Sequence, residues 1–183
     1  MESDKAMSEL EPKIPQEAKD FATLISEVKL LLLELEGVVT DGRVYHDAQG
    51  GQQFATYRAD EAALTAWLAA GRQAVVLARG DLPAAQTWCR RLGLPLAVHQ
   101  GDKERMFRMI LTERGLGPRE TAYLGADLDD MAPMVLCGVA ICPPQAPVWL
   151  REMVHVVTQA AAGRGMVREA VDMMLAGHLP EGA

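Results

Sequence analysis

The chain has 183 residues, of which 49% are hydrophobic and 23% are charged, and its formal net charge at pH 7 is −7. This composition is typical of a folded globular domain with one buried core, and it argues against disordered or fibrous structure. An acidic chain without a basic stripe repels phosphate backbones, so we expect no nucleic-acid partner. The longest apolar run, Met134–Cys142, is far shorter than the ~20 residues that cross a bilayer, and the first residues form no apolar signal region. We therefore expect a cytoplasmic protein without a membrane partner.

The cysteines and histidines form no spacing that is typical of a disulfide framework or a zinc site. We expect reduced, mostly buried cysteines, and histidines that lie mostly on the surface or in loops. These residues are Cys89, Cys137, Cys142, His46, His99, His155 and His178.

The N-terminal 27 residues carry seven acidic side chains against three lysines, with prolines at positions 12 and 15. We interpret residues 1–27 as an acidic extension. Residues 28–177 are predicted to form one folded domain, and residues 178–183 a short tail.

From residue 28 onward, short apolar runs alternate with segments of helical periodicity. The predicted strands cover residues 28–33, 72–77, 96–99, 121–124, 138–141 and 154–157. Two helical stripes are predicted to face the core, one made of Ala62, Ala63, Ala66, Trp67 and Ala70, the other of Met106, Phe107, Ile110 and Leu111. Repeated βα units with short connections predict an α/β fold, a doubly wound parallel sheet with helices on both faces.

One segment interrupts this alternation. Residues 42–57 contain two polar–apolar runs around Gly50 and Gly51, a pair that favours a hairpin turn. The segment follows the first strand directly, so the inserted β-hairpin is expected above the carboxyl edge of the sheet, where such folds bind ligands. There it would cap a site or pair with another chain.

The first strand ends in two acids spaced i and i+2, Glu34 and Glu36, followed by Gly37. Side chains with this spacing point the same way from a strand, and the glycine lets the chain turn sharply. Paired acids at this place suggest phosphoryl or metal chemistry. By itself such a pair is more often a solvated surface feature, so the interpretation depends on the motifs that follow.

Four further segments follow in a set order: VVLARGDLP from residue 75, QGDK from 100, YLGADLDD from 123 and AGRGMVRE from 162. Together with the acids of the first strand, their order and spacing over residues 28–177 resemble the haloacid-dehalogenase (HAD) superfamily. Within it the chain is most similar to the phosphatases that act on 3-deoxy-D-manno-octulosonate 8-phosphate in lipopolysaccharide synthesis. The resemblance implies a Rossmann-like core, a magnesium cofactor, a phosphorylated sugar acid as ligand and a homotetramer assembled through the hairpin.

The resemblance also implies catalytic roles. Glu34 stands where the family has an aspartate that is nucleophile and magnesium ligand. Glu36 stands where the family has an aspartate that is general acid and binds the metal through its backbone carbonyl. Lys103 keeps the place of the lysine that neutralises the phosphate and steadies the nucleophile.

The remaining site residues follow from the same resemblance. Phosphate or substrate binding is implied for Gly37, Ala78, Arg79, Lys103 and Arg164, and metal binding for Glu34, Glu36, Asp127 and Asp130.

Several of these positions depart from the family pattern. Both acids are glutamates, Ala78 replaces a phosphate-binding threonine, Ala126 replaces a metal-binding aspartate, and Glu61 replaces a glycine after the hairpin. A misplacement of ~1 Å in a catalytic group and a lost hydrogen bond to phosphate together cost roughly 10³–10⁴ in rate. We expect a weakened magnesium site and a catalytically impaired pseudo-phosphatase that binds a phosphorylated sugar acid or serves as an assembly module. The alternative is an active magnesium-dependent phosphatase with Glu34 as nucleophile.

Overall fold

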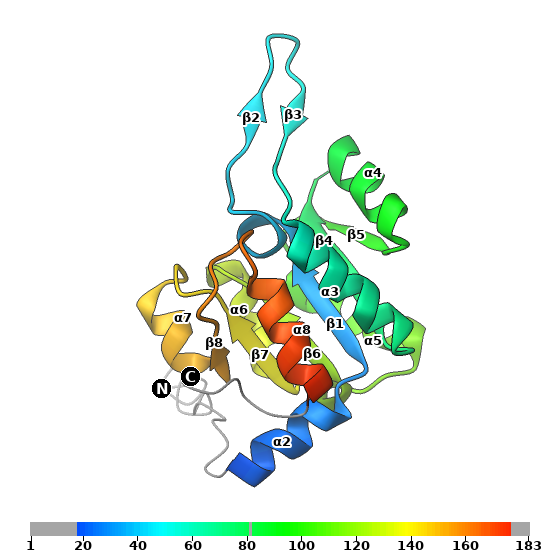
Figure 1. Ribbon diagram of the computed structural model, residues 1–183, viewed down its shortest axis with the longest axis vertical. Helices are drawn as coiled ribbons and strands as arrows, with labels where there is room; N and C mark the ends of the chain where they lie inside the picture. The colour runs from blue at the N-terminus through cyan, green and yellow to red at the C-terminus, as the bar shows by residue number, and fades with distance from the viewer. Residues whose placement is uncertain (1–17, 81, 177–183) are drawn as a thin grey trace, which may run out of the picture.

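The computed structural model describes residues 18–80 and 82–176, and six parallel strands form its central sheet (Figure 1). Their order across the sheet is β5-β4-β1-β6-β7-β8, and every neighbouring pair is parallel. The strands are β1 (Leu30–Glu34), β4 (Gln73–Arg79), β5 (Leu96–His99), β6 (Thr121–Leu124), β7 (Val139–Cys142) and β8 (Val156–Val157). The six strands predicted from the apolar runs, and with them the α/β fold, are confirmed.

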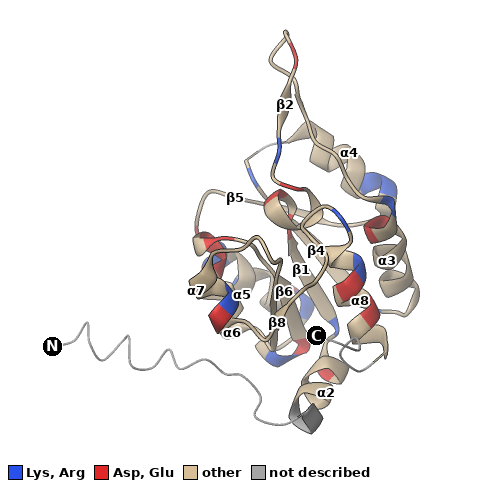
Figure 2. Cartoon of the chain, turned by 60° about the vertical axis from the view of Figure 1, so that its left-hand side comes forward, with Lys and Arg blue, Asp and Glu red and all other residues tan. Residues whose placement is uncertain are grey.

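The central strand β1 is completely buried, since its neighbours β4 and β6 flank it and helices cover both of its faces. Leu31 and Leu33 enter one apolar core, and Leu30 and Leu32 the other. A continuous apolar run is what a strand buried on both faces requires. The only charged residues in the six strands of the described sheet are Glu34 and Arg79, the last residues of β1 and β4 (Figure 2).

The helices divide between the two faces of the sheet. Residues of α2 (Ala18–Glu27), α3 (Arg58–Ala69), α4 (Pro83–Leu92) and α8 (Met166–Ala176) pack into the core that contains Leu31 and Leu33. Residues of α5 (Lys103–Arg114), α6 (Met131–Leu136) and α7 (Val148–Met153) pack into the core that contains Leu30 and Leu32. This two-sided cover confirms the predicted doubly wound arrangement.

The predicted inner face of α3 was partly wrong. Ala62, Ala66 and Ala70 are exposed, whereas the buried side of the helix combines Ala63, Leu64 and Trp67 with two acids, Asp60 and Glu61. Alanine favours helix without favouring burial, so an alanine-rich segment gives no reliable stripe. The stripe predicted for α5 is confirmed, since Phe107, Ile110 and Leu111 are buried and Met106 packs against them.

The helix α2 belongs to the packed fold, because its Phe21 and Ile25 are buried in the core with α8. Residues 18–27 of the predicted acidic extension therefore form a structural helix. Its first 17 residues and the predicted tail at 178–183 lie outside the described residues.

The hairpin consists of β2 (Tyr45–His46) and β3 (Gln52–Gln53), which pair antiparallel and project from the carboxyl edge of the sheet (Figure 1). The predicted hairpin is present, and its turn is longer than the Gly50-Gly51 pair, because His46 pairs with Gln52 and five residues connect the strands. Asp47 shapes this loop by accepting hydrogen bonds from the backbone N–H groups of Gln49 and Gly51.

Two aspartates cap helices. Asp102 accepts a hydrogen bond from the backbone N–H of Arg105 at the start of α5. Asp60, from α3, accepts hydrogen bonds from the backbone N–H groups of Gly165 (3.3 Å) and Arg168 (2.7 Å), and so caps α8 across the structure. Such caps satisfy N–H groups that a helix leaves unpaired in its first turn.

The three cysteines are free and buried, as expected. Within the described ranges, the helices are too short or too polar to span a bilayer.

Candidate functional site

Three neighbouring strands bring most of the predicted site residues to one edge of the sheet. The carboxyl ends of β4, β1 and β6 lie side by side, so Arg79, Glu34 and the turn after Leu124 meet there. Lys103, the first residue of α5, joins them from the side.

A buried polar cluster forms around Glu34, which is 3% exposed. Its Oε1 lies 2.9 Å from Lys103 Nζ and 3.3 Å from His99 Nε2. Lys103 Nζ also lies 2.7 Å from Asp130 Oδ1. The ammonium group therefore bridges two carboxyl groups inside the protein, which is the environment in which a buried charge is tolerated.

Asp130 is committed to the local structure. Its Oδ1 accepts hydrogen bonds from Lys103 (2.7 Å) and from the hydroxyl of Tyr123 (3.0 Å). Its Oδ2 accepts from the backbone N–H groups of Ala126 (2.8 Å) and Asp127 (3.0 Å). Both oxygens are thus occupied by donors that hold the turn after β6.

Burial and the charge of Asp130 raise the pKa of Glu34 to about 8, although Lys103 acts in the opposite direction. Burial lowers the pKa of Lys103, but the charges of Glu34 and Asp130 outweigh it and raise that pKa. Burial and the charges of Lys103 and Arg79 lower the pKa of His99. At neutral pH the cluster therefore contains a charged lysine and a neutral histidine.

The hydrogen bonds of His99 define which ring nitrogen carries its proton. The backbone N–H of Gly101 donates to Nδ1 at 3.3 Å, so in the neutral ring the hydrogen is on Nε2. This nitrogen faces Glu34 Oε1 at 3.3 Å, and neither atom has a hydrogen bond of good geometry.

An ion pair spans the top of this cluster. Arg79 Nη2 donates to Asp129 Oδ2, joining the end of β4 to the turn after β6. Because β1 lies between β4 and β6, the pair crosses over the end of β1 that carries Glu34. Burial raises the pKa of the neighbouring Glu36. Hydrogen bonds from backbone N–H groups, including that of Arg79, and the positive charges of Lys103 and Arg79 oppose this rise.

Glu36 is half-buried and lines two hollows. The first, which we call the carboxyl-edge cleft, has a volume of about 500 Å³. Its polar lining comprises Glu36, Asp41, Arg43, Asp127, Gln145 and Arg164, and Gly37 and Ala126 are among its other lining residues. The second, of about 400 Å³, lies under the hairpin and is lined mainly by apolar residues such as Leu35, Phe54 and Leu82.

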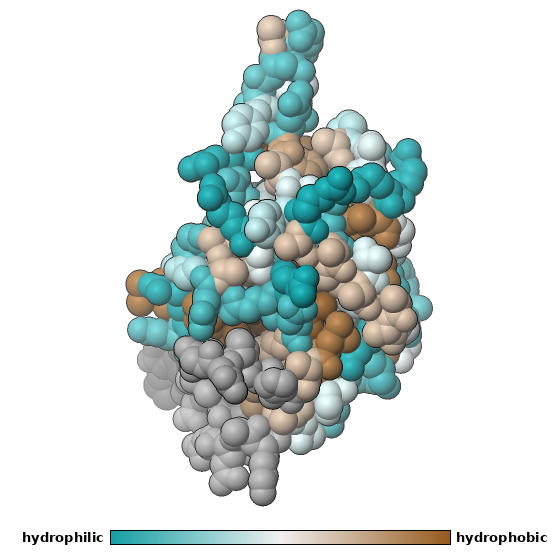
Figure 3. All heavy atoms as spheres, in the orientation of Figure 1, coloured by the Kyte–Doolittle hydropathy of each residue, from teal (hydrophilic) through white to brown (hydrophobic). Residues whose placement is uncertain are grey.

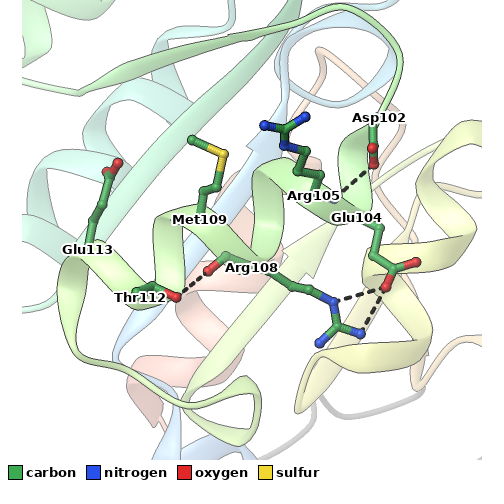
Figure 4. A pocket seen from close by; sticks show the side chains of 7 residues that line it. All are labelled: Asp102, Glu104, Arg105, Arg108, Met109, Thr112 and Glu113. Atoms are coloured by element: carbon green, nitrogen blue, oxygen red, sulfur yellow. Dashed lines mark hydrogen bonds and ion pairs between the residues drawn. The ribbon is translucent and has the colours of Figure 1, made fainter.

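A third hollow has no relation to these residues. A shallow groove of about 560 Å³ runs along the outer side of α5, lined by side chains of that helix and by its cap Asp102 (Figure 4). The Glu104–Arg108 ion pair lies within it. A groove made by one helix surface offers no converging polar groups from other elements.

The residues present do not fit a magnesium site. Magnesium takes carboxylate oxygens in octahedral geometry, but Ala126 has no carboxylate and Asp130 has given its oxygens to four donors. The carboxylate of Asp127 is exposed and accepts from the backbone N–H of Leu128. Across the described parts of the chain, no three His, Cys, Asp or Glu side chains are grouped to hold a metal ion.

Ala78 lies apart from the cleft. Although it is near the end of β4, it is fully buried among the apolar residues of the core that contains Leu31 and Leu33. Glu61 is also distant from the cluster, since it accepts hydrogen bonds from Trp88, Arg91 and Thr56.

Two residues of the cluster were not anticipated from the sequence. His99 is 2% exposed, an exception to the expectation that the histidines lie mostly on the surface or in loops. It ends strand β5, and the rule that strand ends converge would have placed it near Glu34. Asp129 had no such signal, because its partner Arg79 is fifty residues away in the sequence.

The doubly wound sheet with a hairpin after its first strand is similar to solved HAD-superfamily phosphatase structures, with which the chain superposes over most of its length. No family profile matches the chain. Its homologues include 3-deoxy-D-manno-octulosonate 8-phosphate phosphatase KdsC of Haemophilus influenzae, which is 27% identical over 152 residues, 82% of this chain and 84% of the relative. The predicted resemblance to these phosphatases is confirmed.

N-acylneuraminate cytidylyltransferase A of Danio rerio is 30% identical over 81% of this chain, which spans only 35% of that longer protein. The crystal structure of 3-deoxy-D-manno-octulosonate 8-phosphate phosphatase from Yersinia pestis superposes with a TM-score of 0.84 at 26% identity, covering 86% of each chain. A cobalt-bound phosphatase from Haemophilus influenzae superposes with a TM-score of 0.81 at 26% identity, covering 84% of this chain and 91% of that one.

Proposed function

We propose that this chain is a phosphatase-like protein that binds a phosphorylated sugar acid with little or no turnover. Its homologues are phosphatases of 3-deoxy-D-manno-octulosonate 8-phosphate, which supports the ligand class. The proposal of impaired catalysis depends on the residues at the carboxyl edge.

The observation that carries the proposal is the placement of Glu34. A nucleophilic carboxylate must be free to lie in line with the phosphorus. Glu34 is 3% exposed, and its Oε1 lies 2.9 Å from Lys103 and 3.3 Å from His99. A longer side chain enclosed in this way is poorly placed for in-line attack.

The misfit of the metal site supports the same proposal. Without a carboxylate at position 126 and with Asp130 engaged, a bound phosphate relies on basic side chains for charge compensation. Arg79 and Arg164 supply guanidinium groups at this edge, and guanidinium binds phosphate or carboxylate through two parallel hydrogen bonds.

The carboxyl-edge cleft suits a small polar ligand. Its volume of about 500 Å³ lies within the usual range for small-molecule sites. Arg43 and Arg164 suit the acidic groups of a sugar acid, and the carboxylates of Glu36, Asp41 and Asp127 suit hydroxyl donors. These are the roles that we propose for the cleft residues.

The test combines binding and turnover on one preparation. We expect 3-deoxy-D-manno-octulosonate 8-phosphate to bind in calorimetry, while phosphate release is at least ~10³ times slower than for an active relative. Turnover near ~10 per second would refute impaired catalysis and favour Glu34 as a working nucleophile. Absence of binding would refute the ligand proposal and leave the assembly role.

The hairpin supports a proposal of self-assembly, as a homotetramer. Val44 and Tyr45 are 48% and 56% exposed on an otherwise hydrophilic projection (Figure 3). A lone two-stranded hairpin is marginally stable in water and gains from pairing. Light scattering at micromolar concentration tests this proposal, since a mass near that of one 19.9 kDa chain would contradict it.

A further inference from the structure

The Arg79–Asp129 pair lies at the carboxyl edge of the sheet. It joins the end of β4 to the turn after β6, across the intervening β1. The charge of Arg79 acts on Glu36, a residue that lines the carboxyl-edge cleft, and on the buried His99. Arg79 is therefore near both the buried cluster and a residue of the cleft wall.

The pair is exposed enough to exchange. The side chains of Arg79 and Asp129 are 62% and 52% exposed, and an exposed ion pair is a weak interaction. By contrast, Lys103 is 7% exposed and is held between Glu34 and Asp130. Of these two cations near Glu34, only Arg79 is able to leave its carboxylate for another anion without exposing a buried charge.

We propose that Asp129 acts as an internal anion that occupies Arg79 and that the phosphate group of the ligand displaces it. Asp129 then limits the affinity of the site. It favours ligands with a phosphate dianion, which competes better for the Arg79 guanidinium than the Asp129 carboxylate does. The inference rests on the proposed function, because it names a regulator of the same anion site.

Two consequences follow from this competition. Removing the charge of Asp129 frees Arg79 for the incoming phosphate, so binding tightens. This gain in phosphate affinity requires Arg79, because Asp129 and phosphate compete for its guanidinium group. A general decrease in negative charge would instead help phosphate in either background.

The experiment measures inorganic phosphate binding to the full chain by calorimetry at pH 7.5, with Asp129→Asn, Arg79→Gln and the double variant. We expect Asp129→Asn to bind about three- to tenfold more tightly than the unmodified chain. Arg79→Gln is expected to bind at least about tenfold more weakly. The double variant is expected to match Arg79→Gln, because coupled residues are not additive.

The matched control is Asp172→Asn, which breaks a similar exposed Arg–Asp pair on α8, away from the cleft. It lowers the negative charge by the same amount and is expected to leave phosphate affinity unchanged. Circular dichroism and thermal unfolding establish that each variant is folded.

The outcomes separate the two proposals. If the unmodified chain binds phosphate and Asp129→Asn binds it equally well, the displacement inference is refuted while the binding function stands. An equal gain in the Arg79→Gln background, or in Asp172→Asn, also refutes the inference, since it indicates a general charge effect. No phosphate binding by any variant refutes both.

Discussion

His99 Nε2 lies 3.3 Å from Glu34 Oε1, and both side chains are almost completely buried. The histidine ring thus lies against the carboxyl group that the family resemblance assigns as nucleophile. Lys103 approaches the same oxygen, so Glu34 is restrained from two directions. This restraint is a property of the folded protein that variants can test.

Replacement of His99 by alanine should destabilise the protein by about 1–3 kcal/mol, because it leaves a cavity beside Glu34 and leaves the Gly101 N–H without its acceptor. His99→Gln, which fills part of this cavity, should recover part of the loss. Urea unfolding gives the free energies, with His46→Asn on the exposed hairpin as the control. A loss in His99→Ala no larger than in the control would contradict the contact.

Stability should fall in acid because of Glu61. Against the effect of burial, its hydrogen bonds with Arg91, Trp88 and Thr56 lower its pKa to about 2, below the usual 4.5. A lowered pKa in the folded state gives a stabilisation that is complete above the unfolded pKa and is lost as the pH falls through about 2. The contribution is at most about 3 kcal/mol.

The check for Glu61 is urea unfolding between pH 2 and pH 6. Glu61→Gln should reduce the pH dependence in this window, whereas Glu152→Gln, on the exposed side of α7, should not. Identical pH profiles for the unmodified chain and Glu61→Gln would show that the ionised form is not favoured by folding.

Magnesium should not raise the thermal unfolding temperature of the unmodified chain, because the described residues offer no set of carboxylates for it. Ala126→Asp introduces a carboxylate at the edge of the carboxyl-edge cleft, next to Asp127. This variant should gain stability in magnesium, measured by scanning calorimetry with calcium as the comparison ion. A clear magnesium shift in the unmodified chain would revise the site.

Restoring activity should need several substitutions at once. Glu34→Asp alone should recover little phosphate release, while Glu34→Asp, Glu36→Asp and Ala126→Asp together should recover much more, since such residues act as a unit. Adding Ala78→Thr should lower stability, because Ala78 is packed in the apolar core and a buried hydroxyl there lacks a partner. Equal activity in the single and triple variants would indicate that ligand recognition has also changed.

The sequence predicted the elements whose signal is local. Apolar runs between turn residues marked six strands because each run must fill a buried position, and the family resemblance placed Lys103 beside Glu34. The inner face of α3 could not be predicted, since its alanines fit either side of a helix. The Arg79–Asp129 pair depends on which strands are neighbours in the sheet, and no short sequence segment predicts that strand order.

Asp60 ties α3 to the last described helix, and its donor Arg168 lies 108 positions further along the chain. During synthesis on the ribosome, at about 5–20 residues per second, that interval lasts roughly 5 to 20 s. Over this time Asp60 lacks its donors, and the apolar side of α3 lacks the cover of α8. A nascent chain of this protein therefore presents an incomplete sheet with exposed apolar surface to chaperones until its α8 segment emerges from the exit tunnel.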